Sequence, residues 1–232
     1  MFGVPIEKIK KGNPEYELRQ KGKVAELALG YQGGPGALVQ MGALEKGLTE
    51  AELPEIVDRW RNSNRRIVDL WGKIQQASLL CLKTGRTQAI QKNIYFSLEN
   101  GNLAITLPSK RQLFYIKPQI TRNQFGSEAL SYMGQDQTTK KWERIPTYGG
   151  KLTENIVQAI ARDCLANSIK NLVENGYRVL FHIHDEVICE VPKNNDRFAL
   201  NNAIKIMCQA PDWADGLPLN ADGFENDYYK KE

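Results

Sequence analysis

The chain has 232 residues, of which 41% are hydrophobic and 25% charged, a composition typical of a folded globular protein and not of a disordered one. Its net charge of +4 permits a nucleic-acid partner without requiring one. The four cysteines lie far apart and lack C-x-x-C spacing, which argues against a zinc site and a disulfide framework. No apolar run approaches the ~20 residues of a membrane span, so we expect a cytoplasmic protein without membrane contacts.

The first predicted helix begins near Pro14 and ends before Gly30, since Asn13 is a favourable N-cap and glycines follow. Arg19, Lys23, Leu27 and Tyr31 recur every four residues and therefore lie along one stripe of this helix. Two cations one turn apart suit a polyphosphate, because each can bind a different phosphate. The alternative is a solvated basic face with Leu27 and Tyr31 packed beneath it.

Three further helices are predicted in the first part of the chain. A short one covers residues 37–44, a capping box of Thr49 and Glu52 starts another that runs to about Asn62, and Asn64 caps a third that runs to about Lys83. Trp60 and Trp71 are predicted core residues. An arginine cluster at the junction of the last two helices fits either a nucleic-acid backbone or a solvated corner: Arg59, Arg61, Arg65 and Arg66.

The periodicity then changes to that of strands. Residues 94–98, 103–107 and 112–116 predict a small antiparallel meander. Residues 121–144 show no clear period and are predicted to form a connection that Trp142 docks on the protein. Helices are expected from Thr153, as N-cap, to Glu174 and over residues 196–209.

Residues 178–191 predict a β-hairpin with a polar centre, His184-Asp185-Glu186. Apolar strands accommodate these three residues only at the turn, where they are exposed and held by both strands. Adjacent carboxylates attract a hard cation such as Mg²⁺, which prefers oxygen ligands. The alternative is an ordinary polar turn, in which Asp and Glu are common.

Together these stretches resemble the family A DNA polymerases, bacterial DNA polymerase I and its phage relatives. Arg19-x-x-x-Lys23-x-x-x-Leu27-x-x-Gly30-Tyr31 looks like the fingers motif of that family, and His184-Asp185-Glu186 between apolar strands is similar to its palm motif. Between them, Gln158-x-x-x-x-Asp163 resembles the helix that faces the nascent base pair. The resemblance covers essentially the whole chain and is closest to the phage branch, which implies a bacterial or phage-infected host cell.

The resemblance implies a role for each matched residue. Arg19 and Lys23 would bind the phosphates of the incoming dNTP, with Lys23 neutralising charge as pyrophosphate leaves, and Leu27 and Tyr31 would complete the nucleotide pocket. Gln158 and His184 would contact primer–template DNA. Asp185 would ligate both Mg²⁺ ions of a two-metal transfer, assisted by Glu186.

This chain departs from the family pattern in three places. Leu27 stands where the family often has an aromatic ring, and Glu154 stands where it usually has asparagine, with Asn155 one place away. The other metal-binding aspartate of the family lies on a strand before the fingers helix, whereas no Asp precedes Asp58 here. We therefore expect one metal-ligand carboxylate to be missing, an N-terminal polymerase fragment to supply it, and the chain alone to be inactive in primer extension.

The predicted fold class is α+β, with a helical fingers subdomain and a palm subdomain whose antiparallel hairpin packs on helices. The expected parts are residues 1–92, with the nucleotide-binding helix; 93–145, with the meander and connection; and 146–232, with the metal-binding hairpin. Two other functions fit parts of the sequence. One is a non-catalytic nucleotide- or DNA-binding remnant of such a polymerase, and the other is a small metallohydrolase built on His182, His184 and Asp185.

Overall fold

The computed structural model describes residues 3–123 and 125–230. Met1, Phe2, Lys231 and Glu232, at the ends of the predicted first and last parts, and Gln124, in the predicted connection, lie outside the described residues. The chain forms two compact units: Met1–Thr106 with Gln112–Ile156, and Leu107–Arg111 with Val157–Glu232. Helices and antiparallel sheets are both present, as an α+β class requires.

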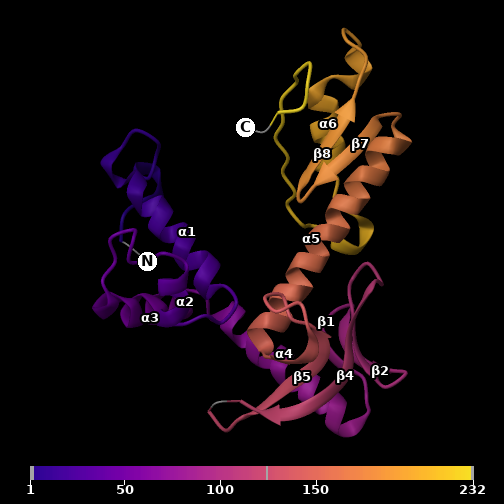
Figure 1. The fold of residues 1–232 in the computed structure, drawn as a ribbon. Coiled ribbons are helices and arrows are strands. Elements are labelled where there is room, and N and C mark those ends of the chain that lie inside the picture. Colours follow the sequence, from indigo (N-terminus) through magenta and orange to yellow (C-terminus); the bar gives the residue numbers. More distant parts are fainter. Residues whose placement is uncertain (1–2, 124, 231–232) are drawn as a thin grey trace. The chain divides into compact units, whose positions relative to one another are not determined.

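The first unit begins with a group of helices (Figure 1). They are α1 Glu17–Leu29, α2 Pro35–Gln40, α3 Leu53–Ser63 and the long α4 Arg65–Thr84. Their shared core contains Leu29, Leu38 and the parallel stacked rings of Trp60 and Trp71, whose centroids lie 5.9 Å apart. Both tryptophans are buried, which confirms their prediction as core residues.

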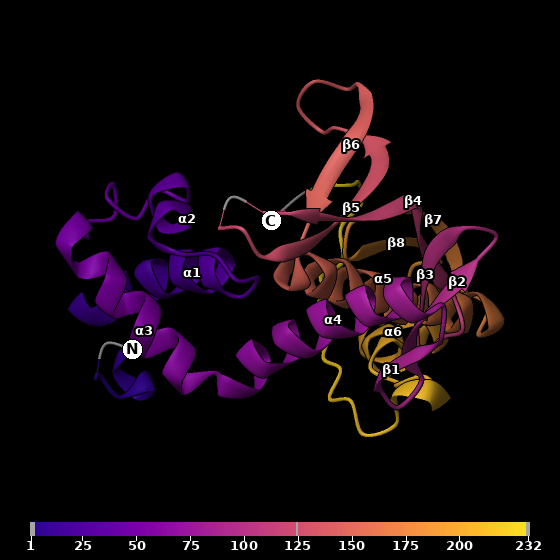
Figure 2. The same cartoon turned by 90° about the horizontal axis from the view of Figure 1, so that it is seen from below.

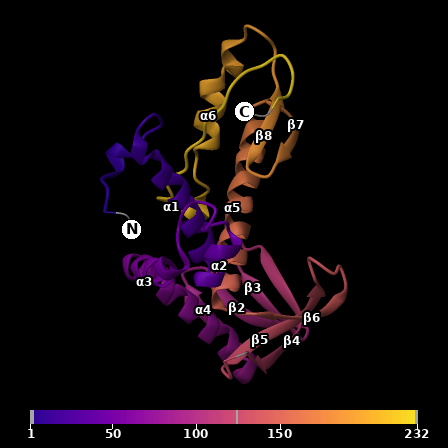
Figure 3. The same ribbon diagram turned by 60° about the vertical axis from the view of Figure 1, so that its left-hand side comes forward.

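A six-stranded antiparallel meander follows the helices in the same unit (Figures 2 and 3). Its strands pair in sequence order: β1 Gln88–Gln91, β2 Ile94–Glu99, β3 Asn102–Thr106, β4 Gln112–Arg122, β5 Glu128–Gln135 and β6 Trp142–Thr147. Helix α4 packs against this sheet, and Phe96, Leu103 and Ile105 are fully buried. The predicted three-stranded meander is thus confirmed and is extended by one strand before it and two after it.

The prediction of a connection over residues 121–144 was wrong, because this segment contains β5 and part of β6. Ala129, Leu130 and Ser131 are buried in succession, so both faces of β5 are covered and the segment shows no alternation of polar and apolar residues. Trp142 does not dock the segment, since it lies in β6 and is 63% exposed.

Helix α5, Gly149–Glu174, begins four residues before the predicted N-cap Thr153. Instead of capping, Thr153 lies inside the helix and its hydroxyl donates to the carbonyl of Gly149 at 2.7 Å. The early start brings backbones into close contact: a Cβ at Gly149 would lie 2.1 Å from the Trp71 carbonyl oxygen, and one at Gly150 would lie 2.4 Å from that of Tyr31. Two glycines therefore permit this junction of α5 with α4 and with the end of α1.

Other predicted helix boundaries differ in smaller ways. The first helix opens with a 3-10 turn, Pro14–Tyr16, and the Asn13 amide donates to the Lys8 carbonyl instead of capping. Asn64 likewise donates to the Trp60 carbonyl. The capping box is present, with the Thr49 backbone N–H and hydroxyl both donating to the Glu52 carboxylate. The helix predicted over 37–44 is Pro35–Gln40.

The second unit contains the last part of α5, a two-stranded sheet and a short helix (Figure 1). The strands are β7 Arg178–Ile183 and β8 Glu186–Glu190, and the helix is α6 Leu200–Met207, shorter than the predicted 196–209. Ser168 of α5 donates to the carbonyl of Met207 at the end of α6, and Phe181 of β7 makes an edge contact with Tyr229.

All four cysteines are free thiols in the structure. Burial raises the pKa of Cys81, Cys164 and Cys189, which keeps these groups in the protonated thiol form at neutral pH. Within residues 3–123 and 125–230, no helix combines the length and the apolar character that a membrane span needs.

Candidate functional site

The basic stripe on α1 lies at the surface. Arg19 and Lys23 are exposed, Leu27 is 52% exposed, and Tyr31 is half-buried just beyond the helix. The core side of the helix is formed instead by Ala25, Ala28 and Leu29, which are buried. The alternative of a solvated basic face is wrong in packing Leu27 beneath that face, because this leucine is exposed on the stripe with the two cations, whereas the exposure of both cations and the partial burial of Tyr31 agree with it.

The two cations of the stripe are not neutralised within the described part of the chain. No ion pair among the described residues includes Arg19 or Lys23, and the Arg19 guanidinium lies 5.8 Å from the ring centroid of Tyr16. The nearby acid Glu26 is engaged elsewhere, since its carboxylate accepts from the Trp60 indole N–H at 2.9 Å. The helix thus presents two exposed positive charges to solvent.

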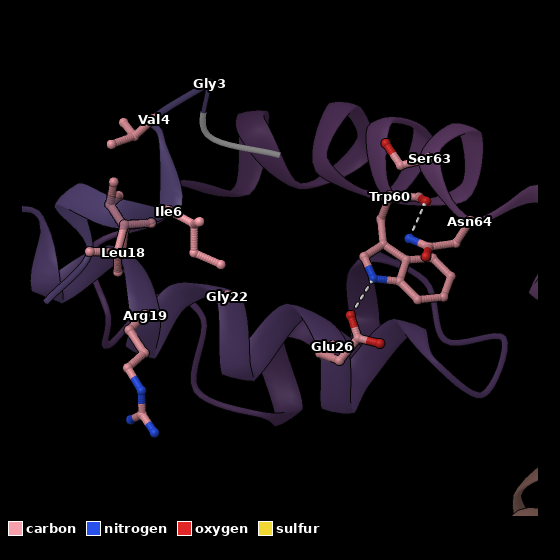
Figure 4. A pocket seen from close by; sticks show the side chains of 11 residues that line it. Gly3, Val4, Ile6, Leu18, Arg19, Gly22, Glu26, Trp60, Ser63 and Asn64 are labelled. Atoms are coloured by element: carbon pink, nitrogen blue, oxygen red, sulfur yellow. Dashed lines mark hydrogen bonds between the residues drawn. The ribbon is translucent and has the colours of Figure 1, made fainter. Parts of the chain in front are cut away.

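A cavity of about 530 Å³ lies beside this stretch of α1 (Figure 4). It is lined by α1, by the end of α3 and by the segment from Gly3 to Ile9. Figure 4 shows Glu26 and Trp60 pointing toward one another while the Arg19 guanidinium extends away from them. Arg19, although it lines the cavity, therefore does not contact Glu26 through its guanidinium.

The loop after α1 is tied to the start of α5. The side-chain oxygen of Gln32 accepts from the Gly150 backbone N–H at 2.9 Å, and Gln32 itself has a φ of 71°. This contact and the tight packing at Gly150 fix the chain next to Tyr31. The end of the stripe consequently has a defined backbone position within its unit.

The second unit carries the predicted hairpin, with His184 and Asp185 at the turn between β7 and β8. His184 has a φ of 53°, the left-handed conformation that tight turns require, and Glu186 begins β8 opposite Ile183. His184, Asp185 and Glu186 are all exposed, as predicted. Among the described residues there is no group of three or more His, Cys, Asp or Glu side chains that could hold a metal ion.

Helix α5 of this unit carries Gln158, whose side chain is exposed. Asp163, quoted with it in the sequence motif, is not exposed: its side chain is 10% accessible and accepts from Ser109 at 2.5 Å and from Arg111 Nε at 2.6 Å. Arg111 also donates to the Ala159 carbonyl at 2.8 Å. These contacts hold the turn Leu107–Arg111 on the part of α5 that carries Gln158.

Arg162, one helical turn after Gln158, was not singled out in the sequence. Its guanidinium lies 3.3 Å from Nε2 of His182 on β7. This contact counts against the metallohydrolase alternative, because it places a cation beside one of the proposed metal ligands. The spacing of Arg162 from Gln158 is the sequence signal that could have identified it.

The structure divides the arginine cluster of α3 and α4. Arg59 pairs with Glu55 at 2.5 Å, and Arg61 donates to the Gly33 carbonyl at 3.1 Å, so both have partners within the helical group. Arg65 and Arg66 are exposed. The cluster is therefore at most a two-residue surface for a nucleic acid.

Comparison with known proteins finds a relative that is named as a DNA polymerase. The DNA polymerase of Bacillus phage SP02 is 51% identical to this chain, and the similarity covers every part of the chain. The chain is similar over its whole length to part of a phage DNA polymerase. It spans 35% of the length of that polymerase. No family model and no solved structure matches the chain.

The resemblance to phage DNA polymerases predicted from the sequence is thereby confirmed for the chain as a whole. The stripe residues Arg19, Lys23, Leu27 and Tyr31 lie in the first unit, and Gln158, His184, Asp185 and Glu186 lie in the second. Within each unit, the structure places the predicted residues at the surface or partly exposed. Their individual roles stay predictions.

Proposed function

We propose that this chain forms the nucleotide-binding and primer-end-binding part of a family A DNA polymerase, which transfers a nucleotide from a dNTP to a primer 3′ end as a template directs. The observation that carries the proposal is the 51% identity of the whole chain to the phage SP02 DNA polymerase. In this proposal residues 1–92 serve as fingers, 93–145 as the meander and its connection, and 146–232 as palm.

Arg19 and Lys23 of α1 are proposed to bind the triphosphate of the incoming dNTP. Both are exposed and lie one turn apart, and the adjacent Glu26 is occupied by the Trp60 indole. Each cation can therefore bind a different phosphate, and Lys23 neutralises the charge that develops as pyrophosphate leaves. Leu27 and Tyr31, next along the stripe, form the side of the nucleotide pocket.

In the second unit, Gln158 and His184 are proposed to contact primer–template DNA, and Asp185 and Glu186 to supply carboxylates for Mg²⁺. Mg²⁺ in polymerases activates the primer hydroxyl and stabilises the departing pyrophosphate. The described residues fit this ion only in part, since these two acids are exposed at one turn but no three-ligand cluster forms around them. We infer that a carboxylate from another part of the polymerase completes the site.

An exchange experiment tests the proposal. The 232 residues replace the homologous segment of the phage SP02 polymerase, and primer extension is measured. We expect activity with the unchanged segment, a loss of about 10²–10³-fold with Lys23→Gln, and a loss to background with Asp185→Asn. Lys21→Gln, a change on the same helix but outside the stripe, serves as the matched control and should stay within about threefold.

The absence of a complete metal cluster among the described residues favours a second candidate, a non-catalytic nucleotide- or DNA-binding remnant of such a polymerase. The two candidates differ in the exchange experiment. A remnant would bind a dNTP or primer–template through the unchanged segment but give no extension in the exchanged polymerase, and Asp185→Asn would have no effect.

A further inference from the structure

The surface of the second unit between α5 and β7 carries a cation that the proposed function leaves unused. Arg162 lies on α5 four residues after Gln158, so the two side chains share one face of the helix, and both are exposed. The contact of Arg162 with His182 brings this helix face beside β7, whose next residues lead into the turn at His184.

The charge of Arg162 is not neutralised by the acid next to it. The carboxylate of Asp163 instead accepts from Ser109 and Arg111. No ion pair among the described residues includes Arg162. An exposed guanidinium without a carboxylate partner is available for an external anion.

His182 orients this guanidinium without cancelling its charge. An arginine only donates hydrogen bonds, so Nε2 of His182 is the acceptor in this 3.3 Å contact and adds no negative charge. The contact restricts the motion of a long side chain, which lowers the entropy cost of binding a ligand there.

We propose that Arg162, held in place by His182, binds a backbone phosphate of the primer–template duplex between the contacts of Gln158 and His184; this inference rests on the proposed function. A polymerase copies every sequence, so a contact at this position must not depend on the base. A phosphate contact meets that condition, because it fixes the position of the duplex and carries no sequence information.

The test is fluorescence-anisotropy titration of the 232-residue chain with a labelled primer–template at several salt concentrations. Arg162→Gln should weaken binding about 10-fold and lower the slope of log K against log salt by about 0.9, the value for one lost phosphate contact. Arg162→Lys should retain the slope. His182→Ala should weaken binding by less than Arg162→Gln and leave the slope unchanged, because it removes the orienting partner and not the charge.

The matched control is Lys170→Gln, which removes an exposed cation from the same helix at a position where Glu174 is its partner, 3.6 Å away. Two duplexes of unrelated sequence should give the same loss for Arg162→Gln. If Arg162→Gln binds as tightly as Lys170→Gln and has an unchanged slope, the inference is overturned. If the unchanged chain does not bind primer–template at all, the proposed DNA contact itself fails and this inference fails with it.

Discussion

Replacing Arg111 with alanine should destabilise the second unit by about 2 kcal/mol. Breaking a fully buried ion pair costs about 3–5 kcal/mol, and breaking an exposed one costs about 0–1 kcal/mol. The pair of Arg111 with Asp163 lies between these limits, since the two side chains are 43% and 10% exposed. The variant leaves the Asp163 carboxylate largely out of water with Ser109 as its remaining donor.

Hydrogen exchange of the backbone amides of residues 157–174, read by mass spectrometry, measures this loss locally. A destabilisation of about 2 kcal/mol should lower their protection about 30-fold if these amides exchange through opening of the whole unit. Lys170→Ala is the control, because its pair with Glu174 is 3.6 Å long and both side chains are well exposed. Equal protection in the two variants would refute the view that Arg111 anchors α5.

Three further predictions concern the first unit. In urea denaturation, Leu27→Ala should change the free energy of unfolding by no more than about 0.5 kcal/mol. Leu29→Ala, at a fully buried position of the same helix, should lower it by about 3 kcal/mol. Similar losses for the two variants would contradict the surface position of the stripe. Burial raises the pKa of Tyr115 to about 12, so the unfolded chain loses this proton first above about pH 10 and stability falls as pH rises. Compared with Tyr115→Phe, the unchanged chain should lose about 2 kcal/mol of unfolding free energy between about pH 9 and about pH 11.5. If the unfolding free energies of the two chains fall in parallel with pH, the raised pKa of Tyr115 is not the cause of the loss. Gly150→Ala should destabilise the unit by at least about 2 kcal/mol in the same assay, because its Cβ would meet the Tyr31 carbonyl, and an unchanged midpoint would show that the junction can relax.

The sequence predicted the elements whose signals are local. Glycines at helix ends and the capping box at Thr49 predicted the helices α1, α3 and α4 to within a few residues. Alternating apolar residues did the same for the strands β2, β3, β7 and β8. The turn position of His184 and Asp185 also followed from local chemistry, because strands with apolar faces leave the turn as the place for such polar residues.

The remaining elements depend on tertiary contacts that leave no local pattern. Strand β5 is covered on both faces, so its buried residues include Ser131 and do not alternate. The start of α5 is set by the close approach of Gly149 to Trp71, which overrides the capping preference of Thr153. The anchoring of Asp163 by Arg111 joins residues 52 positions apart, and no spacing rule connects them.

The hydrogen bond between Glu26 and Trp60 also makes α1 observable without a label. The emission of an indole depends on what its N–H contacts, and this one contacts the same helix that carries Arg19 and Lys23. A triphosphate that moves α1 would change this environment and that of the stacked Trp71 ring. Under the proposed function, the intrinsic fluorescence of this tryptophan pair would therefore report the binding of a nucleotide to α1 in the unmodified protein.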